Sequence, residues 1–92
     1  ENLYTTIVER IKKKPQGSYV AGLVARGPDA VVQKVGEEAV EMVIAASTQT
    51  RERLISEAAD LLFHMMILLA SRGITVREIL NELEGRRKSK TK

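Results

Sequence analysis

Apolar residues recur at every third or fourth position along four stretches of the chain, which is the spacing of one face of an α-helix. The segments between these stretches contain Gly, Pro, Ser or Thr, residues that favour turns and helix ends. The pattern predicts an all-α fold with four main helices, at about residues 3–13, 28–47, 51–72 and 76–84.

The first two predicted helices have recognisable ends. Asn2 is a residue type that caps helix N-termini, and Pro15 is expected to stop the first helix. Pro28 suits the first position of the second helix. Residues 14–27 show no sustained period, so we expect a loop there that can include a short helical turn near residues 21–25.

The last two predicted helices also carry end signals. Thr50 can cap the third helix, and Gly73 stands where a left-handed residue would end it. Thr75 and Glu78 form a capping-box pattern that opens the fourth helix, and Gly85 is expected to end that helix.

The centre of the third predicted helix, residues 61–70, is apolar around nearly its whole circumference apart from His64. In a chain of 92 residues, such a helix needs burial on several sides. We therefore expect a homodimer that completes a larger helical bundle. The expected interface includes Leu62, Met66 and Leu69.

The amino-acid composition limits the domain number, the kind of core and the cellular compartment that we expect. The 92 residues are expected to form a single domain, whose core is aliphatic because 43% of the residues are hydrophobic and none is Trp. No Cys is present, so nothing demands an oxidising compartment and the cytoplasm is the expected location. The apolar run 61–70 is about half the length that a membrane span needs, so no membrane partner is expected.

The net charge of +3 is unevenly distributed. Residues 1–85 carry ten Lys and Arg against twelve Asp and Glu, and residues 86–92 add five basic residues. A basic tail can contact nucleic acid, but this one has no interleaved aromatic residues. We interpret it as a solvated, frayed terminus and expect no nucleic-acid partner.

Acidic residues interrupt the second and third predicted helices. Glu37, Glu38 and Glu41 lie on one helix, and Glu57 and Asp60 lie on the next. Positions three or four apart share a helix face, so two such helices packed side by side would bring four of these carboxylates together.

A solvated acidic face is the simplest alternative, and it predicts basic partners four residues after each acid. Glu38 and Glu57 instead have Met42 and Leu61 at that position. Carboxylates that are half buried and unpaired need a cation. Because the chain has one His and no Cys, Mg²⁺ or Mn²⁺ suits these oxygen ligands better than zinc or copper does.

Three sequence words extend this pattern. They are GSYVAGLVARG at residues 17–27, KVGEEAVEMVIAA at 34–46 and EAADLLFHMMILLASRG at 57–73. The paired acidic motifs resemble those of the all-α nucleotide pyrophosphohydrolases related to MazG. The three words together are similar to the phosphoribosyl-ATP pyrophosphatase family of histidine biosynthesis, over about residues 3–83.

The resemblance implies hydrolysis of phosphoribosyl-ATP to phosphoribosyl-AMP and pyrophosphate, with Mg²⁺ as cofactor. It implies that Glu38, Glu41, Glu57 and Asp60 are the metal ligands. Glu37 is then an outer residue or the base that activates water, which makes Glu37, Glu38 and Glu41 the catalytic set. His64, four residues after Asp60, is expected to be an outer partner of that carboxylate rather than a ligand.

Substrate contacts are expected from residues outside this set. Lys34 shares a face with Glu37 and Glu38, so it can bind a substrate phosphate or pair with the acids, and both readings stay open. Ser18, Tyr19 and Arg26 are candidates for contacts with the nucleotide. Local turn bonding and packing is the alternative role of Ser18 and Tyr19.

Two other functions remain possible at this point. A housecleaning pyrophosphohydrolase for nucleoside triphosphates would use the same metal site, and comparison of its substrates would separate the two enzymes. A non-catalytic helical dimerisation module would carry the acids only for solubility and would release no pyrophosphate from any nucleotide.

Overall fold

The computed structural model describes residues 2–89, and in this part of the chain every regular element is a helix. The all-α prediction is therefore confirmed. The helices are α1 (Asn2–Lys13), α2 (Tyr19–Ala25), α3 (Pro28–Thr48), α4 (Arg51–Ser71) and α5 (Val76–Ser89).

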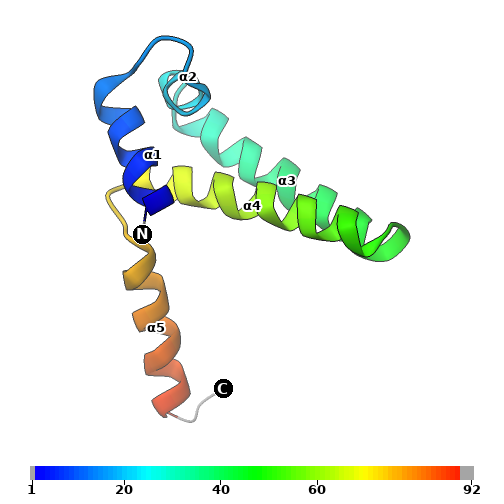
Figure 1. Ribbon diagram of the computed structural model, residues 1–92. Coiled ribbons are helices and arrows are strands. Elements are labelled where there is room, and N and C mark those ends of the chain that lie inside the picture. The colour runs from blue at the N-terminus through cyan, green and yellow to red at the C-terminus, as the bar shows by residue number, and fades with distance from the viewer. Residues whose placement is uncertain (1, 90–92) are drawn as a thin grey trace.

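The two longest helices, α3 and α4, run side by side as an antiparallel hairpin (Figure 1). The short connection at one end of the hairpin joins Thr48 to Arg51. At the opposite end, α1 and α2 pack against the beginning of α3 and the end of α4 (Figure 1). Helix α5 leaves this end and points away from the hairpin (Figure 1).

The hydrophobic core lies where α1 and α2 meet the open end of the hairpin. Its buried members are Ile7, Val20, Leu23, Val31, Met66 and Ile67. The hydroxyl of Tyr4 donates a hydrogen bond to the carbonyl oxygen of Ile74 at 2.7 Å. This bond ties α1 to the segment that leads into α5.

Most of the predicted end signals act as expected. The hydroxyl of Thr50 accepts a hydrogen bond from the backbone N–H of Arg53, and Gly73 has a left-handed φ of 72°. Thr75 and Glu78 form the reciprocal hydrogen bonds of a capping box. The side chain of Asn2 lies outside the part that the structure describes in detail, so the first cap stays a prediction.

The helical turn expected near residues 21–25 is longer than predicted, since it is the seven-residue helix α2, whose first turn Ser18 caps. One predicted boundary is wrong. Helix α5 does not end by Gly85 but continues to Ser89. Arg86 and Arg87 pair with acids one turn earlier, and basic residues are favourable at a helix C-terminus. Residues 86–89 are thus helical rather than frayed, whereas 90–92 lie outside the described residues.

Large apolar side chains are exposed along the hairpin and on α5. On the hairpin they are Val32, Val40, Val43, Ile44, Ile55, Leu62 and Met65, and on α5 they are Ile79, Leu80 and Leu83. Met66, which we expected at or near a dimer interface, is buried in the core of the single chain. Leu62 does present an uncovered apolar surface, with 57% of it exposed.

By length and composition, α4 could cross a membrane, since it has 21 residues and an 18-residue window within it has a mean hydropathy of 1.6. The central helix of a bundle passes the same test, although only 22% of this stretch is buried inside the single chain. Helix α4 also carries buried Glu57 and His64, both polar. We therefore interpret α4 as a bundle helix.

Candidate metal centre

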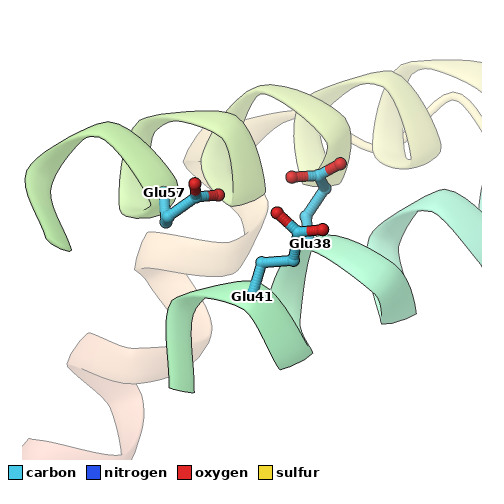
Figure 2. A group of neighbouring side chains, drawn as sticks. All are labelled: Glu38, Glu41 and Glu57. Carbon is cyan, nitrogen blue, oxygen red and sulfur yellow. The ribbon is translucent and has the colours of Figure 1, made fainter. Parts of the chain in front are cut away.

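Three carboxylates converge between α3 and α4. Glu38 and Glu41 lie one turn apart on α3, and Glu57 faces them from α4 (Figure 2). One carboxylate oxygen from each residue lies within 4.8 Å of the others. Glu41 and Glu57 are each about two turns from the connection of the hairpin, so the antiparallel packing places them opposite one another.

The three acids differ in burial. Glu57 is 5% exposed and Glu38 is 8% exposed, whereas Glu41 is open to solvent. The Oε1 atom of Glu57 is buried and has no hydrogen-bond partner among the described residues. A buried oxygen without a partner is costly, so this atom marks a place where a cation or a donor is wanted.

Two basic side chains pair with the buried acids, each from four residues earlier on the same helix. The Nζ of Lys34 lies 3.1 Å from Glu38 Oε2 and 3.8 Å from Glu37 Oε1. The Nη2 of Arg53 donates to Glu57 Oε2. The sequence argument that these acids lack basic partners is therefore wrong, because it examined only the positions after each acid.

The Lys34 pair changes the proton affinity of the lysine. The hydrogen bond to Glu38 is the main cause that raises the pKa of Lys34 above its usual 10.5, and burial opposes the shift. Lys34 therefore stays protonated beside Glu38. Of its two possible roles, the structure shows the pairing with the acids.

Asp60 and His64 are arranged differently from the prediction. Asp60 is exposed and is not part of the three-carboxylate cluster. The Nδ1 of His64 lies 2.7 Å from the backbone oxygen of Asp60, not from its carboxylate, so Nδ1 carries the hydrogen. The Nε2 atom then accepts from the hydroxyl of Tyr19 at 2.7 Å in the neutral imidazole.

The expected nucleotide-contacting residues lie on and around α2. The hydroxyl of Ser18 accepts from the backbone N–H of Ala21, which is the local role of a helix cap. The ring of Tyr19 packs against His64 and Phe63. In the structure, Ser18 therefore makes local turn bonds and Tyr19 packs against neighbouring rings, which are the alternative roles expected for them.

Arg26 follows α2, and its exposed guanidinium makes no ion pair with any residue in the described part of the chain. It lies about 20 Å from Glu41 along the axis of α3. The structure therefore places Arg26 far from the acids, near the opposite end of the hairpin.

Sequence reasoning missed Arg53 and Gln49. The Oε1 of Gln49 accepts a hydrogen bond from Arg53 Nε at 3.3 Å. Both residues line a hollow of about 220 Å³ that Glu41, Ile44 and Glu57 complete. A search for basic residues four positions before each acid would have found Arg53, whereas nothing local points to Gln49.

Comparison with known proteins identifies the family of the chain. Residues 1–87 match the family of phosphoribosyl-ATP pyrophosphohydrolases. The chain belongs to this family. A phosphoribosyl-ATP pyrophosphatase of Saccharolobus solfataricus is 48% identical over 88 residues, which cover 96% of this chain and 94% of that protein. One of Metallosphaera sedula is 47% identical over 96% of this chain and 95% of its own length.

Membership of the phosphoribosyl-ATP pyrophosphohydrolase family makes this chain a hydrolase. The alternative of a non-catalytic dimerisation module is thereby excluded. The three acids between α3 and α4 therefore belong to an enzyme.

Proposed function

We propose that this phosphoribosyl-ATP pyrophosphohydrolase uses the Glu38, Glu41 and Glu57 carboxylates to hold Mg²⁺, or Mn²⁺, while it converts phosphoribosyl-ATP to phosphoribosyl-AMP and pyrophosphate. The reaction is an early step of histidine biosynthesis, and family membership supports it. The observation that carries the metal site is the buried Oε1 of Glu57, which has no partner in the described part of the chain and lies beside two further carboxylates.

The donor set fits a hard divalent cation. All three candidate ligands are carboxylates, and the described residues add no thiolate or imidazole to the cluster. An ion bound there supplies charge that offsets the triphosphate and favours deprotonation of the attacking water. Asp60 is one turn after Glu57 on α4, so its exposed carboxylate is our candidate for a fourth ligand.

Glu37 is the candidate base. Its carboxylate is exposed beside the cluster, where Gln33 Nε2 donates to its Oε2 at 2.9 Å and Lys34 lies close to its other oxygen. These contacts orient the carboxylate toward one face of α3 and leave it accessible to a water molecule. Glu37 therefore takes the proton from the attacking water, and Lys34 holds Glu38 in place.

The substrate's second ribose phosphate needs positive charge away from the metal centre, since the carboxylates cannot bind it. The exposed guanidinium of Arg26 is uncommitted within residues 2–89, which suits this role. Ser18 and Tyr19 lie at the start of α2, and Arg26 follows its end. The Ser18 hydroxyl still has a proton to donate, because its cap bond uses only its oxygen as acceptor.

A second copy of the chain is the partner that we propose for the exposed apolar side chains of the hairpin. Leu62 and Met65 on α4 and Val40 and Val43 on α3 are all uncovered in the single chain. Surfaces of this kind mark protein interfaces. We expect a water-soluble homodimer in the cytoplasm, in which α4 becomes the central helix.

Pyrophosphate release from phosphoribosyl-ATP in the presence of Mg²⁺ tests the proposal. The wild-type chain should release pyrophosphate, and Glu57→Gln should lose nearly all of this activity while keeping its helical circular dichroism. Glu9→Gln is the matched control, since Glu9 is an exposed acid on α1.

Two outcomes of that assay would contradict the proposal. Full activity of Glu57→Gln would remove Glu57 from the centre. Equal turnover of phosphoribosyl-ATP, ATP and dCTP would instead favour the housecleaning function. Asp60→Asn decides in the same assay whether Asp60 belongs to the ligand set.

A further inference from the structure

Arg53 is a charged residue at the metal centre that the mechanism above does not use. Its guanidinium touches Glu57, which is the most deeply buried acid of the cluster. The arginine itself is half exposed, with 54% of its side chain accessible. Arg53 therefore reaches from the surface to the centre.

The contact with Arg53 gives the two oxygens of the Glu57 carboxylate different surroundings. Oε2 accepts from Arg53 Nη2, whereas Oε1 is buried and has no partner among residues 2–89. The carboxylate points toward the two acids on α3 (Figure 2). One oxygen is thus held by the protein and the other is left for a ligand.

Gln49 fixes the guanidinium from its other side. Its Oε1 accepts from Arg53 Nε at 3.3 Å, and Gln49 is the C-cap residue of α3. The backbone N–H of Arg53 is itself bonded to the N-cap Thr50. Arg53 is therefore contacted from both ends of the α3–α4 connection while it contacts Glu57.

The same arrangement occurs on the facing helix. Lys34 on α3 contacts Oε2 of Glu38 from four residues earlier, as Arg53 on α4 contacts Oε2 of Glu57. Both buried acids of the cluster are thus held by a cation through one oxygen. Glu41, which is exposed, has no ion pair within the described residues.

We propose that Arg53 is a positioning residue, which anchors one oxygen of Glu57 so that the other is presented to the divalent cation. The inference rests on the proposed metal centre. Partners that hold a ligand in this way typically change metal affinity about 10–100-fold when they are removed. The opposite reading is that the guanidinium repels the cation and competes with it for Glu57.

Calorimetric titration of the full chain with Mn²⁺ alone tests this proposal without any substrate. Arg53→Gln removes the charge but keeps a polar side chain, and we expect it to weaken Mn²⁺ binding about 10–100-fold with unchanged helical circular dichroism. Arg53→Lys should restore part of the affinity, because an ammonium can hold Glu57 but cannot also bond Gln49 in the same fork. Arg51→Gln, an exposed arginine on the same helix, should bind as the wild type does.

Three results would overturn the proposal. Unchanged Mn²⁺ affinity in Arg53→Gln would reduce the contact to a surface ion pair. Tighter binding would show that Arg53 competes with the cation. A wild-type chain that binds no Mn²⁺ would overturn this proposal and the metal centre together, whereas the first two results leave the proposed function standing.

Gln49→Ala gives an independent check on the same chain of contacts. It leaves Arg53 and Glu57 in place but frees the guanidinium on one side, so we expect a smaller loss of Mn²⁺ affinity in the same direction. Wild-type affinity in this variant together with weakened binding in Arg53→Gln would confine the positioning role to Arg53.

Discussion

Replacing Glu41 with Gln should stabilise the metal-free protein and destabilise the metal-loaded protein relative to the wild type. Glu41 suits this test because it is exposed, so the amide fits without repacking. Unlike Glu38 and Glu57, it has no ion pair within the described residues. Its removal therefore takes away repulsion and little attraction.

The size of the effect follows from the geometry of the cluster. Two carboxylates whose nearest oxygens lie within 4.8 Å repel by about 1 kcal/mol at the dielectric constant of water and by about 3.5 kcal/mol at an effective value of 20. Glu41 is solvated, and Lys34 and Arg53 partly neutralise its two neighbours, so the low end applies. We expect a gain of about 1 kcal/mol, which raises Tm by roughly 4–8 °C in a domain of this size.

Bound metal should reverse the order of stability of Glu41→Gln and the wild type. At a concentration of 100 times its Kd, a ligand of the folded state adds about 2.7 kcal/mol to stability. Glu41→Gln loses a charged ligand and so loses most of this gain. Thermal unfolding should therefore rank the variant above the wild type in a chelator and below it in excess Mg²⁺.

The measurement is a pair of thermal melts at one fixed protein concentration, because the proposed dimer would make Tm depend on concentration. Glu9→Gln, which removes an exposed acid outside the cluster, should shift Tm little in either condition. A lower Tm for Glu41→Gln in the chelator, or an equal rise of both proteins with Mg²⁺, would refute the reasoning.

Three further predictions follow from individual residues. Arg26→Ala should lower kcat/KM for phosphoribosyl-ATP by about 10- to 150-fold and leave residual ATP hydrolysis unchanged, and equal losses on both substrates would place Arg26 at the shared triphosphate instead. Leu62→Glu, at an exposed apolar position of α4, should shift the sedimentation mass from dimer to monomer, and a wild-type monomer at micromolar concentration would contradict the dimer. Lys34→Met should lower the free energy of unfolding by about 0.5 kcal/mol at neutral pH. Because the pKa of Lys34 is raised in the folded protein, this difference should persist up to pH 10.5 and should vanish as the pH rises above the folded pKa. Urea titrations at a series of pH values measure it.

Helix ends and helix faces could be read from the sequence because they depend on neighbouring residues. The Thr50 cap, the left-handed Gly73 and the Thr75–Glu78 capping box each involve groups a few positions apart. The family could be recognised for a related reason, since the acids and the words around them are contiguous in the chain.

The same local reading fails where two signals compete. Gly85 is a helix-ending residue type, but acidic and basic residues spaced one turn apart continue α5 past it. Ser18 lies before the short turn that the sequence predicts, although its hydroxyl caps a seven-residue helix. In both places the winning interaction involves a side chain whose orientation the sequence does not specify.

Only the tertiary structure decided which groups of the centre meet. Glu57 joins Glu38 and Glu41, while Asp60 lies outside their cluster, because the register of α4 against α3 sets which turns face each other. The hydroxyl of Tyr19 on α2 bonds His64 on α4, 45 residues away in the sequence. The sequence by itself determined that acids would line two helix faces. The packing of those faces determined that Glu57 would be buried with one oxygen held by Arg53 and the other unpartnered, because burial and contacts between helices depend on distances that local spacing does not contain.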